Sequence, residues 1–357
     1  MTRVVVSFVI LTAAPAAAGE YHPAEPCPFT VKPDGTAEEL GFGSQFDGQF
    51  PLLFTARMNA ADARPGRADN PDRKAILARL DKDADPAARA VDLIRLGRAD
   101  EAVNLLTPLS RGRSPDFRVL ANLAHAHARR GEWGEAVPLH ELAAFEVGLP
   151  ADLAGTASDQ RKWLTRVERQ YYAKWLHVSR DRAAKRYAVE SEDVFPLFPV
   201  KWVNEAGRYE PGALAAAERA KLPADAVAVV QQLLLWAPND TGLYWLLAEV
   251  YAATGRLRQA DVIFTQCVDG RQFSNRPVFM AHRAAVADAV KRLPPEKTAE
   301  EVILPDAPPA APPKPAGGDF LPSRERLIAV AVGFAGLAAV LIGLQVRSVA
   351  RRWGRKG

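Results

Sequence analysis

The histidines are the first place to look for chemistry, because imidazole serves both in acid–base catalysis and as a metal ligand. The segment that begins His140-Glu141 starts like the zinc-protease pattern, which needs a second histidine four residues after the first. Ala144 stands at that position, so half of the metal-binding helix face is missing. His125 and His127 are two residues apart and point to different helix faces, which is poor for chelation. His127 and His140 fall at core positions of the sequence pattern, so we expect packed histidines there and no metal site.

The remaining reactive residues form no recognised constellation. His22, Glu25 and Cys27 are close in sequence, but they lie in a segment without regular periodicity, so no metal is expected there. Two interpretations of the cysteines remain open. Cys27 and Cys267 could form a disulfide in an oxidising compartment, or Cys267 could be a small buried core residue. The chain has no nucleophile elbow, phosphate-binding loop, dinucleotide fingerprint or haem-attachment motif. We therefore expect no cofactor and no enzyme.

The charge of the chain is concentrated at its two ends. The formal net charge is +4 at pH 7, of which residues 1–18 carry +1 and residues 323–357 carry +6. Residues 19–322 therefore carry −3. A nucleic-acid-binding protein concentrates positive charge on its folded body. This body is mildly acidic, so nucleic acid is not an expected partner.

Both ends of the chain have the pattern of topology signals. Residues 1–18 contain Arg3, a short apolar run and a final Ala16-Ala17-Ala18, which is typical of a secretory signal peptide. Residues 327–346 lack any charge and as a helix would measure about 30 Å, the thickness of the hydrocarbon layer. The basic tail 347–357 should stay in the cytoplasm. We expect a single-pass protein of a bacterial inner membrane, with its N-terminal body in the periplasm.

Two segments of the predicted body have no repeat pattern. Residues 304–322 are rich in proline, which favours an extended, semi-rigid stalk. Residues 19–70 contain phenylalanines without clean periodicity, and we interpret them as an irregular arm whose aromatic rings dock on the body. A helix is expected to start near Asp72, after the turn signals of Asn70-Pro71.

A 34-residue period is the most informative feature of the sequence. Gly97 and Ala102 recur as Gly131 and Ala136. A second pair of units covers 207–240 and 241–274. The second of these reads Tyr244-x-x-Leu247-Ala248-x-x-Tyr251-x-x-x-Gly255, followed by Ala260-x-x-x-Phe264.

This pattern resembles the tetratricopeptide repeat (TPR), a helix-turn-helix unit. The resemblance implies an all-α, TPR-like helical solenoid in which small residues allow helices to approach and bulky residues fill the space between them. The implied repeat core comprises Leu123, Ala124, Gly131, Ala136, Tyr244, Leu247, Ala248, Tyr251, Gly255, Ala260 and Phe264. The glycines after the first helices should adopt left-handed caps. Residues 277–292 should form a capping helix.

One long helix is expected between the two pairs of repeats. Over 158–190, Trp163, Val167, Tyr171 and Trp175 fall four residues apart and form one apolar stripe. Nine basic residues lie along 159–186. In an exported protein, a solvent-exposed arginine-rich face is a better explanation for them than nucleic-acid binding. Residues 193–199 should pack where the two repeat blocks meet.

These expectations combine into one domain plan. It comprises a signal peptide (1–18), an irregular arm (19–70), a first TPR-like block (71–150), a basic, aromatic helix with its connector (151–206), a second block with its capping helix (207–303), a Pro-rich linker (304–322), a transmembrane helix (327–346) and a basic tail (347–357).

The resemblance implies a scaffold that binds protein partners on its concave face. The residues expected there are Arg118, Ala121, His125 and Arg129 in the first block and Trp245 and Glu249 in the second. The alternatives are an accessory subunit of an envelope enzyme, or an enzyme itself, with an unrecognised site. A further alternative is a self-associating envelope protein that dimerises through small residues of the span, such as Gly333 and Gly343.

Overall fold

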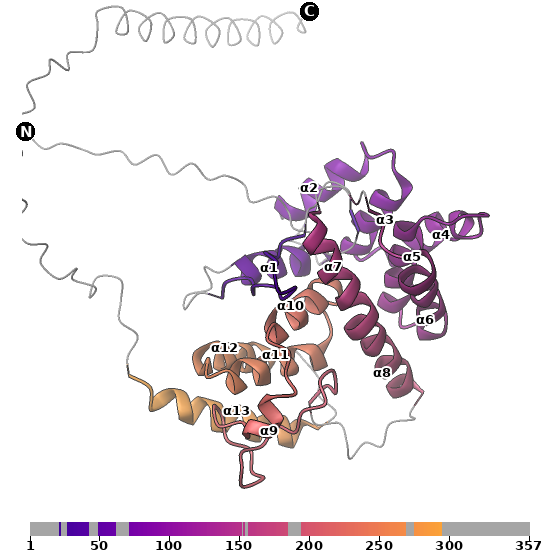
Figure 1. Ribbon diagram of the computed structural model, residues 1–357. Coiled ribbons are helices and arrows are strands. Elements are labelled where there is room, and N and C mark those ends of the chain that lie inside the picture. The colour runs from indigo at the N-terminus through magenta and orange to yellow at the C-terminus, as the bar shows by residue number, and fades with distance from the viewer. Residues whose placement is uncertain are drawn as a thin grey trace, which may run out of the picture. The chain divides into compact units, whose positions relative to one another are not determined.

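The computed structural model describes residues 21–22, 27–42, 49–61, 71–151, 153, 156–184, 194–268 and 275–294 (Figure 1). Within these ranges the regular secondary structure is helical, and the one β interaction is an isolated antiparallel bridge between Val31 and Ala37. The expected all-α class is confirmed for this part of the chain. The described residues up to Leu293 form one compact unit.

The first block stacks successive helices against one another. It contains α2 (Pro71–Leu80), α3 (Pro86–Arg95), α4 (Ala99–Ser110), α5 (Phe117–Arg129), α6 (Trp133–Glu141) and the π-helix η1 (Leu142–Val147). The α3 helix packs on α4, α4 on α5, and α5 on α6. Asp85 and Asp116 start α3 and α5 because each carboxylate accepts a hydrogen bond from a backbone N–H of the first turn.

The turns inside the helix pairs are closed by glycines, as the sequence predicts. Gly97, Gly131 and Gly255 have φ of 75°, 73° and 80°, in the left-handed region. In each turn the next residue donates its N–H back into the preceding helix, as Glu132 does to His127 O at 3.0 Å. Glycine has no Cβ and therefore adopts this conformation at no steric cost, so its position determines where the first helix ends.

The residues assigned to the repeat core lie inside the molecule. Ala124, Ala136, Ala248 and Ala260 have no exposed surface, and they lie where α5 meets α6 and where α11 meets α12. Leu123, Tyr244, Leu247, Tyr251 and Phe264 are at most 2% exposed. Gly131 and Gly255 lie at the turns instead.

One long helix follows the first block (Figure 1). It consists of α7 (Ser158–Arg166), the π-helix η2 (Val167–Tyr172) and α8 (Ala173–Ala183). The predicted stripe is buried at Trp163, Val167 and Trp175, but Tyr171 is only half-buried and Tyr172 takes its place in the core. A π-helix holds an extra residue per turn, which rotates the following side chains and shifts the stripe by one position.

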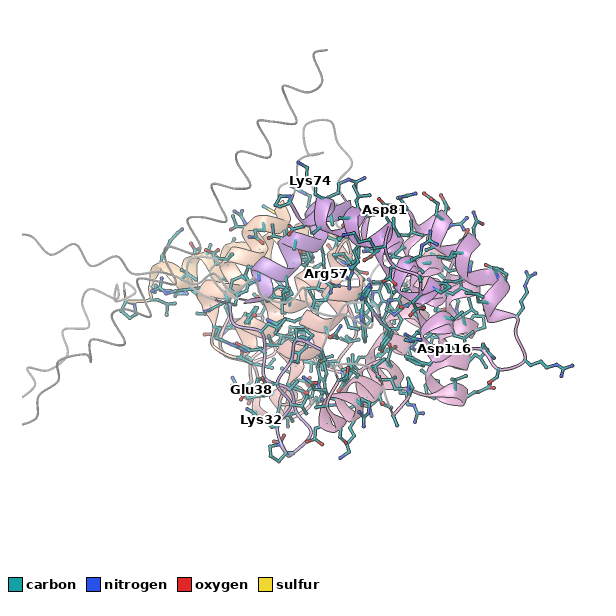
Figure 2. The ribbon with its side chains drawn as sticks, turned by 90° about the horizontal axis from the view of Figure 1, so that it is seen from above. Lys32, Glu38, Arg57, Lys74, Asp81 and Asp116 are labelled. Atoms are coloured by element: carbon teal, nitrogen blue, oxygen red, sulfur yellow. The ribbon has the colours of Figure 1, made fainter. Side chains whose placement is uncertain are left out.

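The N-terminal arm contains a helix that the sequence analysis did not predict. Residues 49–61 form α1 (Gln49–Ala61), with Pro51 in its first turn, where a missing N–H is tolerated. Arg57 of α1 is buried, and its guanidinium donates to Leu235 O at 2.6 Å, whereas Lys32 and Glu38 pair on the outside of the arm (Figure 2). Phe29 and Phe50 are 1% exposed, so these arm rings dock on the body as expected.

The second block contains α9 (Ala216–Arg219), α10 (Ala226–Trp236), α11 (Thr241–Ala253), α12 (Leu257–Val268) and α13 (Arg276–Lys291). Every residue of α10 is buried, because α1, η2 and α11 all pack on it. The unit 207–240 lacks a full first helix, since a loop and the short α9 precede α10. The capping helix is present as α13, which packs on α12.

Several expectations fall outside the described residues. These are the signal peptide 1–18, the stalk 304–322, the span 327–346 and the tail 347–357. In the ranges that the structure does describe, none of the helices combines the length and the apolar character that crossing a bilayer requires.

Candidate functional site

The first block holds the start of the arm against the side of α5 where the sequence predicted a partner. The backbone N–H of Tyr21 donates to Asn122 Oδ1 at 3.1 Å, and the ring of Tyr21 meets that of Phe117 edge-on at 4.8 Å. The Tyr21 hydroxyl donates to Glu168 Oε1 of η2. Tyr21 is therefore bound by a backbone contact, a ring contact and a buried carboxylate.

Glu168 is the centre of a buried polar network. His140 Nε2 of α6 lies 2.7 Å from Glu168 Oε2, and both side chains are 1% exposed. Burial alone raises the pKa of Glu168, but His140, His125 and Tyr21 together outweigh it and hold the pKa below its ordinary value. Burial and the neighbouring carboxylate raise the pKa of Tyr21, which keeps its hydroxyl a donor. A neutral tyrosine hydroxyl therefore donates a hydrogen bond to an ionised glutamate.

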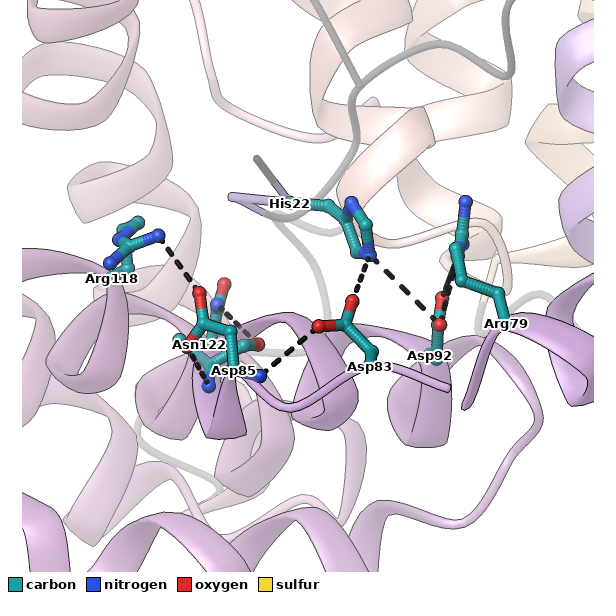
Figure 3. Close-up of polar contacts among 8 residues, drawn as sticks. His22, Arg79, Asp83, Asp85, Asp92, Arg118 and Asn122 are labelled. Atoms are coloured by element: carbon teal, nitrogen blue, oxygen red, sulfur yellow. Dashed lines mark hydrogen bonds and ion pairs between the residues drawn. The ribbon is translucent and has the colours of Figure 1, made fainter. Parts of the chain in front are cut away.

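His22 lies beside two aspartates of the same block (Figure 3). Its Nε2 is 3.5 Å from Asp83 Oδ2 in the α2–α3 loop and 4.0 Å from Asp92 Oδ2 on α3. Asp92 is buried and also accepts hydrogen bonds from Arg79 of α2. We call the residues that contact Tyr21 and His22 the arm site: Asp83, Asp92, Phe117, Asn122, His125, Glu168 and Trp236.

The rest of the arm is held by different elements. Gln160 of α7 donates to Phe29 O at 2.8 Å. Asp225 accepts from Ala37 N at 3.1 Å, and Gln231 of α10 both accepts from Leu40 N at 2.8 Å and donates to Leu40 O at 3.0 Å. These hydrogen bonds give the buried backbone groups of the arm the partners that water would otherwise provide.

The second block has a matching cluster around Glu249, which is 1% exposed. Its carboxylate lies 2.7 Å from His282 Nδ1 and accepts from Trp245 Nε1 at 2.8 Å and from the Tyr209 hydroxyl at 2.9 Å. The rings of Tyr209 and His282 stack at 3.5 Å. Tyr209 comes from a loop of residues 194–215, which we call the strap. Burial and Glu249 raise the pKa of Tyr209, so its hydroxyl stays protonated.

The expectation of an open concave face is wrong for four of its six residues. Ala121, His125, Trp245 and Glu249 are at most 3% exposed. His125 stacks on Tyr172 and meets Trp236 edge-on, while Trp245 meets Phe279 edge-on. The arm, the long helix, α10 and the strap cover these faces, since each supplies apolar surface that the repeats need to bury.

The remaining two predicted residues reach the surface. Arg118 is partly exposed and pairs with Asp85 at 3.0 Å and with Asp116 at 3.3 Å, so it braces the starts of α3 and α5 (Figure 3). Arg129 is also partly exposed, at the end of α5.

Sequence reasoning missed Tyr21, Glu168, Tyr209 and His282 of the two glutamate clusters, and Asp83, Asp92, Phe117 and Asn122 of the arm site. Tyr21, Glu168, Tyr209 and His282 come from segments without the repeat period, so the pattern could not place them. The one available signal was Glu168, an acidic residue directly after Val167 of the apolar stripe.

The two clusters share one chemical arrangement. In each, a buried glutamate receives a tyrosine hydroxyl from a covering segment and lies beside a histidine. Carboxylates with this many donors are held in fixed positions, which orders the segments around them. Among the described residues, no group of three or more His, Cys, Asp or Glu side chains is arranged to hold a metal ion. Cys27 and Cys267 are both buried and are not joined in a disulfide.

Comparison with known proteins gives one match. A family model of the tetratricopeptide repeat matches residues 119–147, which cover α5 from its third residue, α6 and η1. The chain therefore contains a tetratricopeptide repeat there, and the other repeat units stay predictions. No curated protein and no solved structure matches the chain.

Proposed function

We propose that this protein is a scaffold that binds other proteins through its helical-repeat body. The tetratricopeptide repeat at 119–147 carries the proposal, because modules of this kind typically mediate protein–protein interaction. The two glutamate clusters agree with it. Their polar groups bind segments of the chain itself and leave the body a rigid support.

We further propose that the body is tethered to a bacterial inner membrane and works outside the cytoplasm. The support is the sequence of its ends, a signal-peptide pattern in 1–18 and an uncharged stretch at 327–346 followed by a basic tail. Cysteine-scanning accessibility in intact cells tests this topology. Reagents that cannot cross the membrane should label a cysteine placed at exposed Lys201, but not one placed at Lys356.

Chemical crosslinking in the native membrane tests the scaffold role. The full chain is compared with a control in which residues 71–293 are replaced by an unrelated soluble domain between the same ends. Partner proteins should crosslink to the full chain and not to the control. Identical protein sets from both chains would show that the ends, and not the repeats, collect the neighbours.

A further inference from the structure

We propose that the arm site is a peptide-binding site for a tyrosine followed by a positively charged residue, and that Tyr21-His22 occupies it as an intramolecular ligand. This inference rests on the proposed scaffold function and names the partner chemistry of one site. A partner segment of this type would bind by displacing the start of the arm.

The tyrosine half of the site recognises both the aromatic ring and the hydroxyl. The ring of Tyr21 meets Phe117 at 4.8 Å and Trp236 at 6.3 Å, so a flat aromatic side chain fills this position. Its hydroxyl donates to Glu168, an anion that phenylalanine would leave without this donor. Asn122 accepts the backbone N–H, a contact that any residue except proline provides.

The second half of the site selects positive charge. Asp83 and Asp92 both face His22, and Arg79 also pairs with Asp92. The neighbouring Asp85 is paired with Arg118 (Figure 3). Both carboxylates lie within 4.0 Å of the imidazole nitrogen. Two carboxylates at this distance favour a cationic side chain at the second position and would repel an acidic one.

The start of the arm is separable from the rest of the arm. Residues 27–42 are held by Gln160, Asp225 and Gln231, whereas Tyr21 is hydrogen-bonded to Asn122 and Glu168. Releasing the dipeptide therefore leaves these anchors in place. Only four residues, 23–26, separate the dipeptide from Cys27, and a short tether of this kind gives an effective concentration on the order of millimolar. A partner has to compete with that concentration.

Peptide binding to the full chain in detergent tests the proposal. The probe is a fluorescent peptide of residues 19–26, GEYHPAEP, and the receptor is the double variant Tyr21→Ala and His22→Ala. The peptide should bind the double variant at least about tenfold more tightly than it binds the unaltered chain. Peptides with Tyr21→Phe or His22→Gln should bind more weakly, and His22→Glu should bind most weakly.

Absence of peptide binding to the folded double variant, with thermal unfolding as the check on folding, would overturn the proposal. So would equal binding of the His22→Glu peptide. If the double variant fails to fold, the receptor becomes the single variant His22→Ala, which keeps Tyr21 in place; the same order of peptides is expected, and equal binding of all peptides would overturn it. The scaffold function has its own test in the crosslinking experiment, which registers partners at any surface of the body.

Discussion

Glu168 and His140 are 28 residues apart in the chain, yet His140 Nε2 lies 2.7 Å from Glu168 Oε2 in the interior. This contact joins the tetratricopeptide repeat to the long helix, since His140 belongs to α6 and Glu168 to η2. Tyr21 adds the arm to the same carboxylate. One buried anion thus ties three segments together.

The substitution Glu168→Gln should destabilise the protein by about 3 kcal/mol at pH 7, because it removes one partner of a buried charged cluster. The pKa of Glu168 is lowered in the folded state, so its contribution is present above the ordinary value of 4.5 and is lost as the pH falls through the folded pKa. Urea unfolding of both chains between pH 7 and pH 3 measures this. Their difference should shrink below about pH 4.5; a constant difference would contradict the assignment.

The turn glycine Gly131 should not tolerate alanine. Its φ is 73°, where a Cβ is strained, so Gly131→Ala should cost about 1 kcal/mol. Gly134, three residues later in α6, has ordinary helical geometry and open space, so Gly134→Ala should be neutral or stabilise by up to about 1 kcal/mol. Thermal unfolding of both variants checks the pair, and equal effects would show that the turn does not require glycine.

Tyr209 should hold the strap mainly through its ring. Tyr209→Phe keeps the stack on His282 and loses only the hydroxyl bond to Glu249, at about 1 kcal/mol. Tyr209→Ala loses both and should cost about 3 kcal/mol. The neighbouring Arg208→Ala is the control, since that side chain is exposed. Denaturant unfolding gives the three values; a Tyr209→Phe loss as large as that of Tyr209→Ala would assign the contact to the hydroxyl.

Both cysteines should react slowly in the native protein. Burial raises the pKa of Cys27 to about 11, and Cys267 has no exposed surface. At pH 8, about one Cys27 side chain in a thousand is then in the reactive thiolate form. Maleimide labelling followed by mass spectrometry should modify neither thiol before unfolding and both in denaturant. Rapid labelling of the native chain, or a disulfide under non-reducing conditions, would contradict this packing.

Local patterns predicted the parts of the fold that a single repeat unit determines. The glycine spacing placed the left-handed turns at Gly97, Gly131 and Gly255, because that backbone geometry depends on one residue type. The alanine and leucine positions predicted the part of the buried set of α5 and α11 that packs inside one helix pair, such as Leu123 and Ala248. These features depend on neighbours a few residues away, which sequence periodicity records.

Contacts between distant segments were not predictable in the same way. Ala121, His125, Trp245 and Glu249 were expected to face a partner, and segments without the repeat period cover them instead. Nothing in the period of α5 indicates that Tyr21, 101 residues before Asn122, returns to bind it. The shift from Tyr171 to Tyr172 also depends on a π-helix that a four-residue spacing does not reveal.

Photo-crosslinking from one side chain tests the central claim most directly. A photoreactive residue replaces exposed Asp81, two positions from Asp83, in the full chain in intact cells, and exposed Lys201 on the strap is the control position. The account predicts partner proteins crosslinked at position 81, in larger yield when Tyr21 and His22 are both alanine, and few at position 201. If the folded chain crosslinks no protein at position 81 with the arm either intact or altered, the arm site does not bind a partner.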